Sequence, residues 1–137
     1  MTEQGIFNCV WTHLNAQGKA AVSTTTGDCA YRGEGGTACA AGCLIDDALY
    51  DPSIEGTSLL GAIRVRDGDA TDRRRQKLYD ALVASGVAPK HFEFVHEMQL
   101  MHDGRLRDHG LDSWREQMRD FAKDRNLTVP QEPGATP

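Results

Sequence analysis

The first pattern of polar and apolar positions along the chain is that of an amphipathic helix. Apolar residues recur at the spacing of one helix face, and they are Ile6, Phe7, Val10, Trp11 and Leu14. Thr2 stands at a favourable N-cap position, and Gly18 follows the last turn. The pattern therefore predicts a helix that begins after Thr2 and ends at Gly18.

The helical period disappears between residues 20 and 66. Short apolar pieces at 29–32, 39–45 and 63–65 alternate there with glycines and threonines, which is typical of short strands joined by turns. The glycine-rich run at 33–36 supplies residues that tolerate a positive φ angle, as a tight connection requires. We expect a small antiparallel sheet or hairpin in this part of the chain.

The second half of the chain returns to helical spacing. One helix is predicted from residue 71 or 72 to 85, and another from 89 to 104 with apolar residues on more than one face, which places it centrally. A last helix is predicted from Ser113, because Ser113 and Glu116 form a capping-box pattern. The predicted fold class is α+β, with about four helices packed against the small antiparallel β-sheet or hairpin.

Length and composition fit one folded unit. The 137 residues, of which 39% are hydrophobic, match the size of a typical domain, and we expect a single globular domain over residues 1–127. Three prolines and a glycine in the last ten residues predict a flexible C-terminal tail over 128–137. The sequence has no apolar run long enough for a membrane span and no signal-peptide pattern. We expect no membrane partner and a cytoplasmic location.

The net charge of −5 is unevenly distributed. Residues 1–70 hold nine acidic and four basic residues, whereas residues 71–137 hold eleven of each. Such a chain has no overall positive field, so nucleic acid is not expected as a partner. There is a basic run of Arg73, Arg74, Arg75 and Lys77, and an acidic run of Asp46, Asp47, Asp51 and Glu55. We interpret the basic run as a solvated helix face, and the acidic run as a surface that docks on a basic partner.

The glycine-rich run and the arginine before it form a candidate recognition loop. Backbone N–H groups of such a run can make a nest for a phosphate, and a neighbouring tyrosine can stack on a base. The run has neither P-loop nor G-x-G-x-x-G spacing, so a hairpin with a bracing arginine is the alternative interpretation. The candidate ligand- or partner-binding residues are Tyr31, Arg32, Gly33, Gly35, Gly36, Thr37, Asp46, Asp47, Asp51 and Glu55.

The cysteines offer a metal site as one alternative. Cys29, Cys39 and Cys43 can supply three thiolates to a zinc ion, with a histidine as the fourth ligand, although their spacing differs from that of C-x-x-C knuckles. Small free thiols packed among alanine and glycine are the simpler interpretation. We therefore expect no cofactor, and keep zinc as the alternative.

A cysteine- and histidine-dependent hydrolase or transferase is a further alternative. Cys29 or Cys39 would be the nucleophile, with Cys39 preferred, and His102 would be the general base. Asp103 or a more distant carboxylate would orient the imidazole. Neighbours on a helix point about 100° apart, which predicts that Asp103 is badly placed to hold the ring of His102. A histidine that bonds to backbone in a structural turn is the simpler interpretation, so we expect a binding protein rather than an enzyme.

Residues 29–50 carry a family resemblance. They match the pattern C-x-Y-R-G-x-x-G-x-x-C-A-x-G-x-L-I-x-D-x-x-Y, which resembles small proteins encoded by tailed bacteriophages and prophages. The similarity continues through Glu55 and Gly56 to the helix that ends in His102 and Asp103. The resemblance implies a viral accessory gene that is expressed in a bacterial host, and it implies no mechanism.

The expected function follows from this resemblance and from the candidate loop. Small phage accessory proteins often antagonise host defence. We expect a protein that acts by non-covalent binding to a host defence or regulatory component, either a host bacterial protein or a signalling nucleotide, in the cytoplasm of the host cell. A homo-oligomer is compatible with these features, and a small metal-stabilised module without a defence role is the other alternative.

Overall fold

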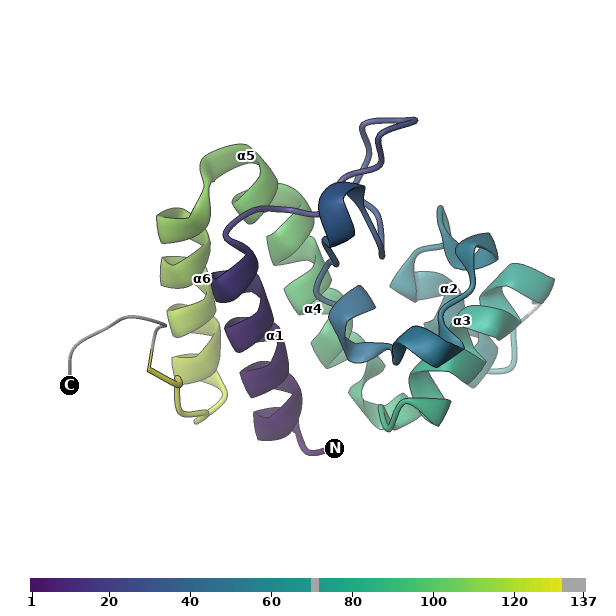
Figure 1. Cartoon of the computed structure of the whole chain (residues 1–137). Coiled ribbons are helices and arrows are strands. Elements are labelled where there is room, and N and C mark those ends of the chain that lie inside the picture. Colours follow the sequence, from purple (N-terminus) through teal and green to yellow (C-terminus); the bar gives the residue numbers. More distant parts are fainter. Residues whose placement is uncertain (70–71, 132–137) are drawn as a thin grey trace.

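The computed structural model describes residues 1–69 and 72–131 and shows an all-α protein (Figure 1). The helices are α1 (Glu3–Gln17), α2 (Leu59–Arg66), α3 (Arg73–Ala84), α4 (Phe92–Met101), α5 (Arg107–His109) and α6 (Leu111–Asp124). These described residues contain no strand, and the isolated bridges of Val22 with Cys29 and of Arg32 with Ala38 do not extend into a sheet. The predicted α+β fold is therefore wrong.

Helix α4 lies at the centre of the molecule, as its apolar pattern predicts. α1 and α6 pack against it on one side, and α2 and α3 form a pair on the other side (Figure 1). Phe92, Val95 and Met98 of α4 are fully buried. A helix with apolar residues on several faces can be buried completely only when neighbours cover each face.

Aromatic side chains join α1 to α6. The rings of Trp11 and Trp114 stack with their centroids 5.5 Å apart, and Phe7 stacks against both Trp11 and Phe121. Both tryptophans are fully buried. Because large aromatic rings bury more apolar surface than other side chains, this stack is a major contribution to the core.

The segment between α1 and α2 is irregular rather than a sheet. It contains single turns of 3₁₀-helix at Glu34–Gly36, Gly42–Leu44, Asp47–Leu49 and Pro52–Ile54, and a fifth such turn, Pro89–His91, precedes α4. The predicted strand at 63–65 lies inside α2. The prediction failed because apolar runs of three to seven residues fit a strand and a buried helical turn equally well.

The helix ends agree with the sequence in α1 and α3 and differ in the later helices. The Oγ1 atom of Thr2 accepts a hydrogen bond from the Gly5 N–H, and Gly18 adopts a φ of 77°, as predicted. The helix predicted to end at Gly104 continues instead through a π-helical turn, His102–Leu106, into α5. α6 begins before Ser113, directly after Gly110, whose positive φ reverses the chain earlier than the capping-box pattern suggests.

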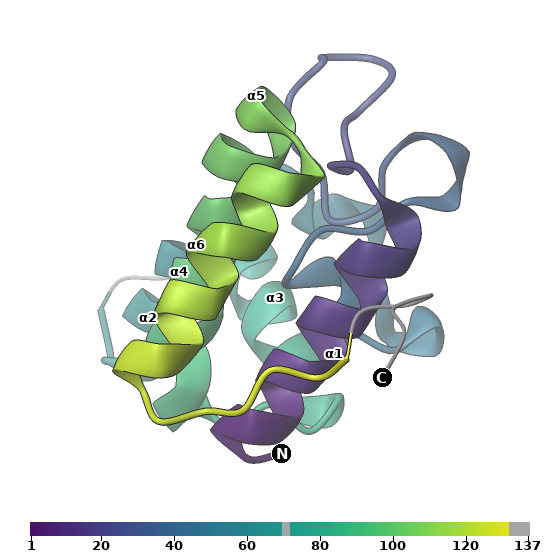
Figure 2. The same cartoon turned by 90° about the vertical axis from the view of Figure 1, so that its left-hand side faces the viewer.

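The chain after α6 returns along α1 (Figure 2). The backbone of Thr128 exchanges two hydrogen bonds with the side-chain amide of Gln4. Residues 132–137 of the predicted tail, and residue 71 at the predicted start of α3, lie outside the described residues. None of the helices in the described ranges combines the length and the apolar character needed to cross a membrane.

Candidate functional site

A buried imidazole lies at the C-terminal end of α4. His102 is fully buried, and its Nε2 atom accepts a hydrogen bond of 3.0 Å from the Ala21 N–H. Since that nitrogen uses its lone pair, the ring proton is on Nδ1, which lies 2.8 Å from Oδ1 of Asp103. The ring is therefore a neutral tautomer with both nitrogens occupied, and it cannot take a proton from a nearby thiol.

Asp103 holds the ring of His102, contrary to the prediction from helical spacing. That prediction assumed a regular α-helix, whereas the backbone changes to the π-helical turn at His102. The same Oδ1 atom accepts a hydrogen bond of 2.7 Å from Gln99. Burial alone would raise the pKa of Asp103, but the hydrogen bonds from His102 and Gln99 outweigh it and hold the pKa below its usual value.

The candidate nucleophiles remain protonated at neutral pH. Burial raises the pKa of the Cys39 thiol to about 12, although its sulfur accepts a hydrogen bond from the Gly42 N–H. Burial and the charge of Asp103 raise the pKa of Cys29 to about 11. A catalytic cysteine needs the opposite shift. His102 and Asp103 thus lie together as a triad requires, but their hydrogen bonds serve to hold the fold together. We call Gln99, His102 and Asp103, which are joined by these bonds, the hub.

One group of possible metal ligands exists among the described residues. The ligand atoms of Cys29, His102 and Asp103 all lie within 4.8 Å of one another. A metal on Nδ1 of His102 would displace its proton while Nε2 still accepts from Ala21, so the ring would have to become an anion. The group therefore does not fit a zinc ion in this arrangement, and the predicted partners Cys39 and Cys43 are not part of it.

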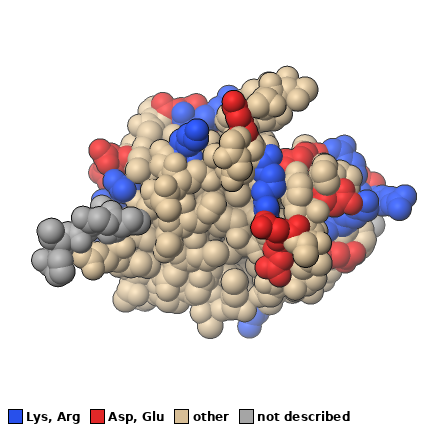
Figure 3. All heavy atoms as spheres, in the orientation of Figure 1, with Lys and Arg blue, Asp and Glu red and all other residues tan. Residues whose placement is uncertain are grey.

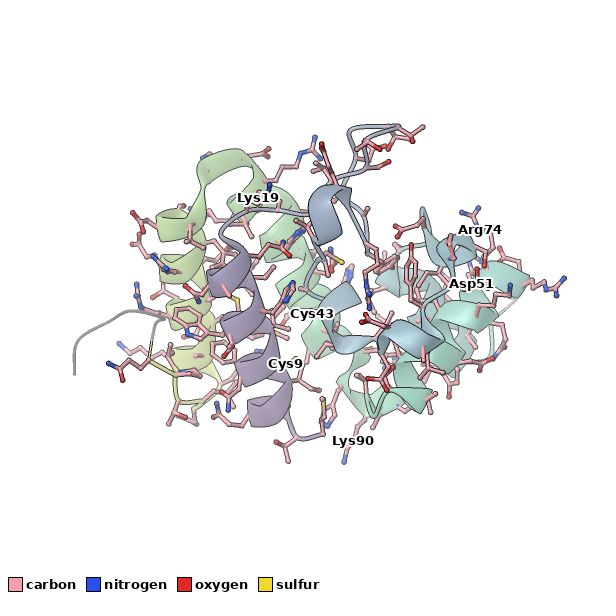
Figure 4. All side chains as sticks on the ribbon, viewed as in Figure 1. Cys9, Lys19, Cys43, Asp51, Arg74 and Lys90 are labelled. Atoms are coloured by element: carbon pink, nitrogen blue, oxygen red, sulfur yellow. The ribbon has the colours of Figure 1, made fainter. Side chains whose placement is uncertain are left out.

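Cys43 forms a pair with Cys9 instead. The two side chains lie beside each other where α1 meets the Gly42–Leu44 turn (Figure 4). The neighbouring Cys43 thiol, whose hydrogen is donated to the Ala40 carbonyl at 3.1 Å, lowers the pKa of Cys9 to about 7, and the pKa of Cys43 itself is raised. The sequence gives no signal for this pair, because the two cysteines belong to separate elements.

Arg32 and Glu55 of the predicted surface bind other parts of the protein. The Arg32 guanidinium pairs with Asp47 at 2.5 Å, donates to the Ile45 carbonyl at 2.6 Å and lies over the ring of Tyr50. Glu55 accepts hydrogen bonds from the N–H groups of Tyr31 and Arg32. These two charged side chains brace the irregular segment from within.

The other predicted binding residues are divided between the interior and the surface. In the glycine turn, the N–H of Gly33 bonds to the Thr37 carbonyl, and the Thr37 hydroxyl bonds to the Glu34 carbonyl. Asp51 pairs with Lys77, and its pKa is lowered to about 2 by the Ser53 N–H and the lysine. The exposed members are Gly35, Gly36, Asp46 and Asp47. The N–H groups of Gly33, Glu34 and Thr37 are bonded to backbone carbonyls, so these three do not point at a ligand.

An open cleft lies beside the buried hub. It has a volume of about 230 Å³ and is enclosed by residues 29–31, residues 55–59 and one face of α4. Leu100 stands at its rim with 56% of its surface exposed, and Asp103 lies in its wall. The Tyr31 hydroxyl donates to the Thr57 carbonyl and closes one side. A second hollow, of about 290 Å³, shares residues 29–30 and 55–56 with the cleft and extends to Ser23 and Asp28.

The cleft contains both predicted and missed residues. Tyr31 and Glu55 were predicted from the sequence, whereas His96 and Leu100 were missed. The signal for Leu100 is the apolar pattern that surrounds the α4 helix, because one such position remains exposed after packing.

Comparisons of the chain with protein-family models, with curated proteins and with solved structures find no match. The function of the cleft therefore has to be inferred from its own geometry and chemistry.

Proposed function

We propose that this protein is a phage accessory protein that acts by non-covalent binding to a host bacterial protein. The observation that carries the proposal is the open cleft between residues 29–31, residues 55–59 and α4, with the exposed Leu100 at its rim. The pattern at 29–50, which resembles phage and prophage proteins, supports the viral origin. The proposed role is to block a defence or regulatory component of the host.

The size of the cleft favours a protein over a nucleotide as the occupant. Pockets for small ligands usually have volumes of about 300–1,000 Å³, and this cleft has about 230 Å³. A cleft of this size suits one large side chain, and interfaces commonly depend on a single anchor residue in a pocket. We infer that the partner inserts an aromatic or aliphatic side chain next to Leu100.

The charge around the cleft favours a partner with basic residues beside that anchor. The lowered pKa of Asp103 keeps it ionised, and its side chain is 40% exposed. Glu55 is a second carboxylate in the lining of the cleft, and no lysine or arginine is among the described residues that line it. Carboxylates around an apolar pocket increase the rate of association with a basic partner and exclude an acidic one.

The state of the hub supports binding rather than catalysis. Both ring nitrogens of His102 are hydrogen bonded, and the thiols of Cys29 and Cys39 have raised pKa values. Nucleophilic catalysis needs a free base and a thiolate, and these side chains supply neither.

The test is affinity capture from a bacterial host lysate with a matched pair of variants. Leu100→Glu places a charge at the rim of the cleft, whereas the control Val83→Glu makes the same change at an exposed position of α3 outside the cleft. We expect one host protein to be captured by the wild type and the control, with at least about tenfold less captured by Leu100→Glu. Equal capture by both variants, or no capture by the wild type, would overturn the proposal.

A further inference from the structure

A third hollow, which is polar, lies between α2 and the first turns of α3. Its volume is about 330 Å³, and three arginines line it: Arg64 of α2, and Arg74 and Arg75 of α3. Among the described residues of its lining, Asp72 is the one carboxylate. Figure 3 shows acidic as well as basic side chains at this end of the molecule, whereas the surface over α1 is largely uncharged.

Two glycines make room for the arginines. A Cβ atom on Gly61, which is buried in α2, would lie 2.9 Å from Cγ of Arg75. Gly56 has a φ of +81°, and a Cβ atom there would lie 3.2 Å from the Arg74 guanidinium. A side chain at either position would displace an arginine from the hollow. Arg74 and Arg75 belong to the basic run that the sequence predicts to be a solvated helix face, and they line this hollow.

Two of the three arginines, Arg74 and Arg75, are held in place without being fully neutralised. Arg74 donates to the carbonyls of Ser53 and Glu55, and carbonyl groups orient a guanidinium without cancelling its charge (Figure 4). Nε of Arg75 lies 3.9 Å from Asp72, at the outer limit of an ion pair. Asp72 also caps α3 by accepting a hydrogen bond from the Arg75 N–H. Three arginines beside one carboxylate leave the hollow with an excess of positive charge.

The start of α2 adds hydrogen-bond donors to the same hollow. The N–H groups in the first turn of a helix have no acceptor within the helix, and the helix dipole favours an anion there. The Gly61 N–H donates to the Ser58 carbonyl at 2.9 Å, so the donors left in this turn are the N–H groups of Leu59 and Leu60, which the Ser58 side chain does not cap. Ser58 and Thr57 both line the hollow, so their hydroxyl groups lie on the same wall as the arginines.

We propose that this hollow binds the phosphate group of a small phosphomonoester. Guanidinium groups bind phosphate oxygens through paired N–H donors, and the excess charge of the lining matches a phosphomonoester dianion better than a singly charged carboxylate. The volume lies at the lower end of the range for small-ligand pockets. The site is separate from the proposed protein-binding cleft, although residues 56–58 form a wall of both.

The experiment is a calorimetric titration of the full chain with inorganic phosphate and, separately, with adenosine 5′-monophosphate. Arg64→Gln and Arg75→Gln each remove one positive charge from the hollow. The control, Arg73→Gln, removes the same charge from an exposed neighbour in the basic run that does not line the hollow. We expect saturable binding to the wild type and the control, weakened at least about tenfold by either hollow variant.

Comparison of the two titrations shows whether the site recognises phosphate alone or phosphate as part of a nucleotide. Equal affinity for both probes indicates that the phosphate alone is recognised, and tighter binding of the nucleotide indicates contacts to the sugar or base. The proposal is overturned if neither probe binds at up to about 10 mM, or if Arg73→Gln weakens binding as much as the hollow variants. The exposed Arg64 position keeps the test valid if an Arg75 variant is unstable.

Discussion

At the scale of single residues, the imidazole of His102 joins two parts of the chain that are 81 positions apart. One ring nitrogen accepts from the backbone of the irregular segment, and the other donates to Asp103 within the π-helical turn. A buried polar group with both partners satisfied stabilises a particular arrangement of the chain. We therefore expect His102, which the sequence suggested as a general base, to contribute to the stability of the fold.

Replacement of His102 by alanine tests this structural role. His102→Ala leaves the Ala21 N–H without its acceptor and opens a cavity, so we expect a loss of about 2–4 kcal/mol in the free energy of unfolding. Urea denaturation followed by circular dichroism measures the change. The control His109→Ala alters an exposed position of α5 and should cost less than about 0.5 kcal/mol. Similar losses for the two variants would show that the hub contributes nothing.

Cys9 is expected to be the most reactive thiol of the chain near neutral pH. Its pKa is about 7, whereas the pKa values of Cys29 and Cys39 are about 11 and 12. Since the thiolate is the reactive form, iodoacetamide should modify Cys9 first, at a rate that rises as the pH passes through 7. Peptide mass spectrometry identifies the site.

The matched variants for this labelling are Cys43→Ala and Cys29→Ala. Loss of the Cys43 thiol should raise the pKa of Cys9 and move the labelling profile to higher pH, because the interaction with that side chain is the largest cause of the lowered pKa. Cys29→Ala should leave the profile unchanged. Faster labelling of Cys29 or Cys39 than of Cys9 would contradict the assignment.

At the scale of elements, the helices with clear start and stop signals were predictable. α1 has Thr2 and Gly18 at its ends, and α3 follows the cap Asp72. The segment from 18 to 58 was not predictable, because its backbone is bonded by side chains from distant elements. Gln17, Gln99 and His102 each accept from a backbone N–H of this segment, and sequence spacing holds no information about such long-range pairs.

The candidate site was predictable to a similar extent. The sequence indicates that Arg32 and Glu55 matter, but their contacts with Asp47 and with the backbone of residues 31–32 appear only in the folded chain. Leu100 and Arg64 entered no motif, because each belongs to a helix whose neighbours determine what remains exposed. Residue type indicated which groups are chemically important, and packing determined which of them face the solvent.

Gly42 and Gly104 make a matched pair for the packing of the irregular segment. A Cβ atom on Gly42 would lie 2.1 Å from the carbonyl oxygen of Tyr31, whereas one on Gly104 would meet no other atom within 4 Å. We expect Gly42→Ala to destabilise the fold by about 2 kcal/mol or more. Gly104→Ala should be neutral or should stabilise by up to about 1 kcal/mol. Thermal melting of the two variants decides the point, and equal melting temperatures would contradict the close approach.

At the scale of the whole molecule, several carboxylates have lowered pKa values, and we expect them to make the fold less stable as the pH becomes acidic. The backbone N–H of Ser53 and the Lys77 side chain lower the pKa of Asp51 to about 2, and Arg66 lowers the pKa values of Asp67 and Glu93. The folded protein therefore binds fewer protons than the unfolded chain at acid pH, so these groups stabilise the fold above their unfolded pKa values of about 4. Their contribution disappears as the pH falls through the folded values.

Urea midpoints measured from pH 7 to pH 2 test this dependence. We expect a nearly constant midpoint down to about pH 5 and a progressive fall below about pH 4. Asp51→Asn should have a shallower fall at the acid end, because it lacks the carboxylate whose pKa is about 2. A midpoint that stays constant to pH 2 in the wild type would show that these ion pairs do not affect stability, as many exposed pairs do not.

Four side chains hold the irregular segment by its main chain. Gln17, Glu55, Gln99 and His102 accept from the N–H groups of Ala38, Tyr31, Ala41 and Ala21 in turn. A replacement at one of these four bonded positions keeps the hydrogen bond unless it is proline, which has no N–H. The side chains at these positions are buried, so a replacement must also fit the packing around it. A chain that diverges from this one would therefore keep the shape of the segment only while it keeps both the four accepting residues and the volumes of the four bonded ones.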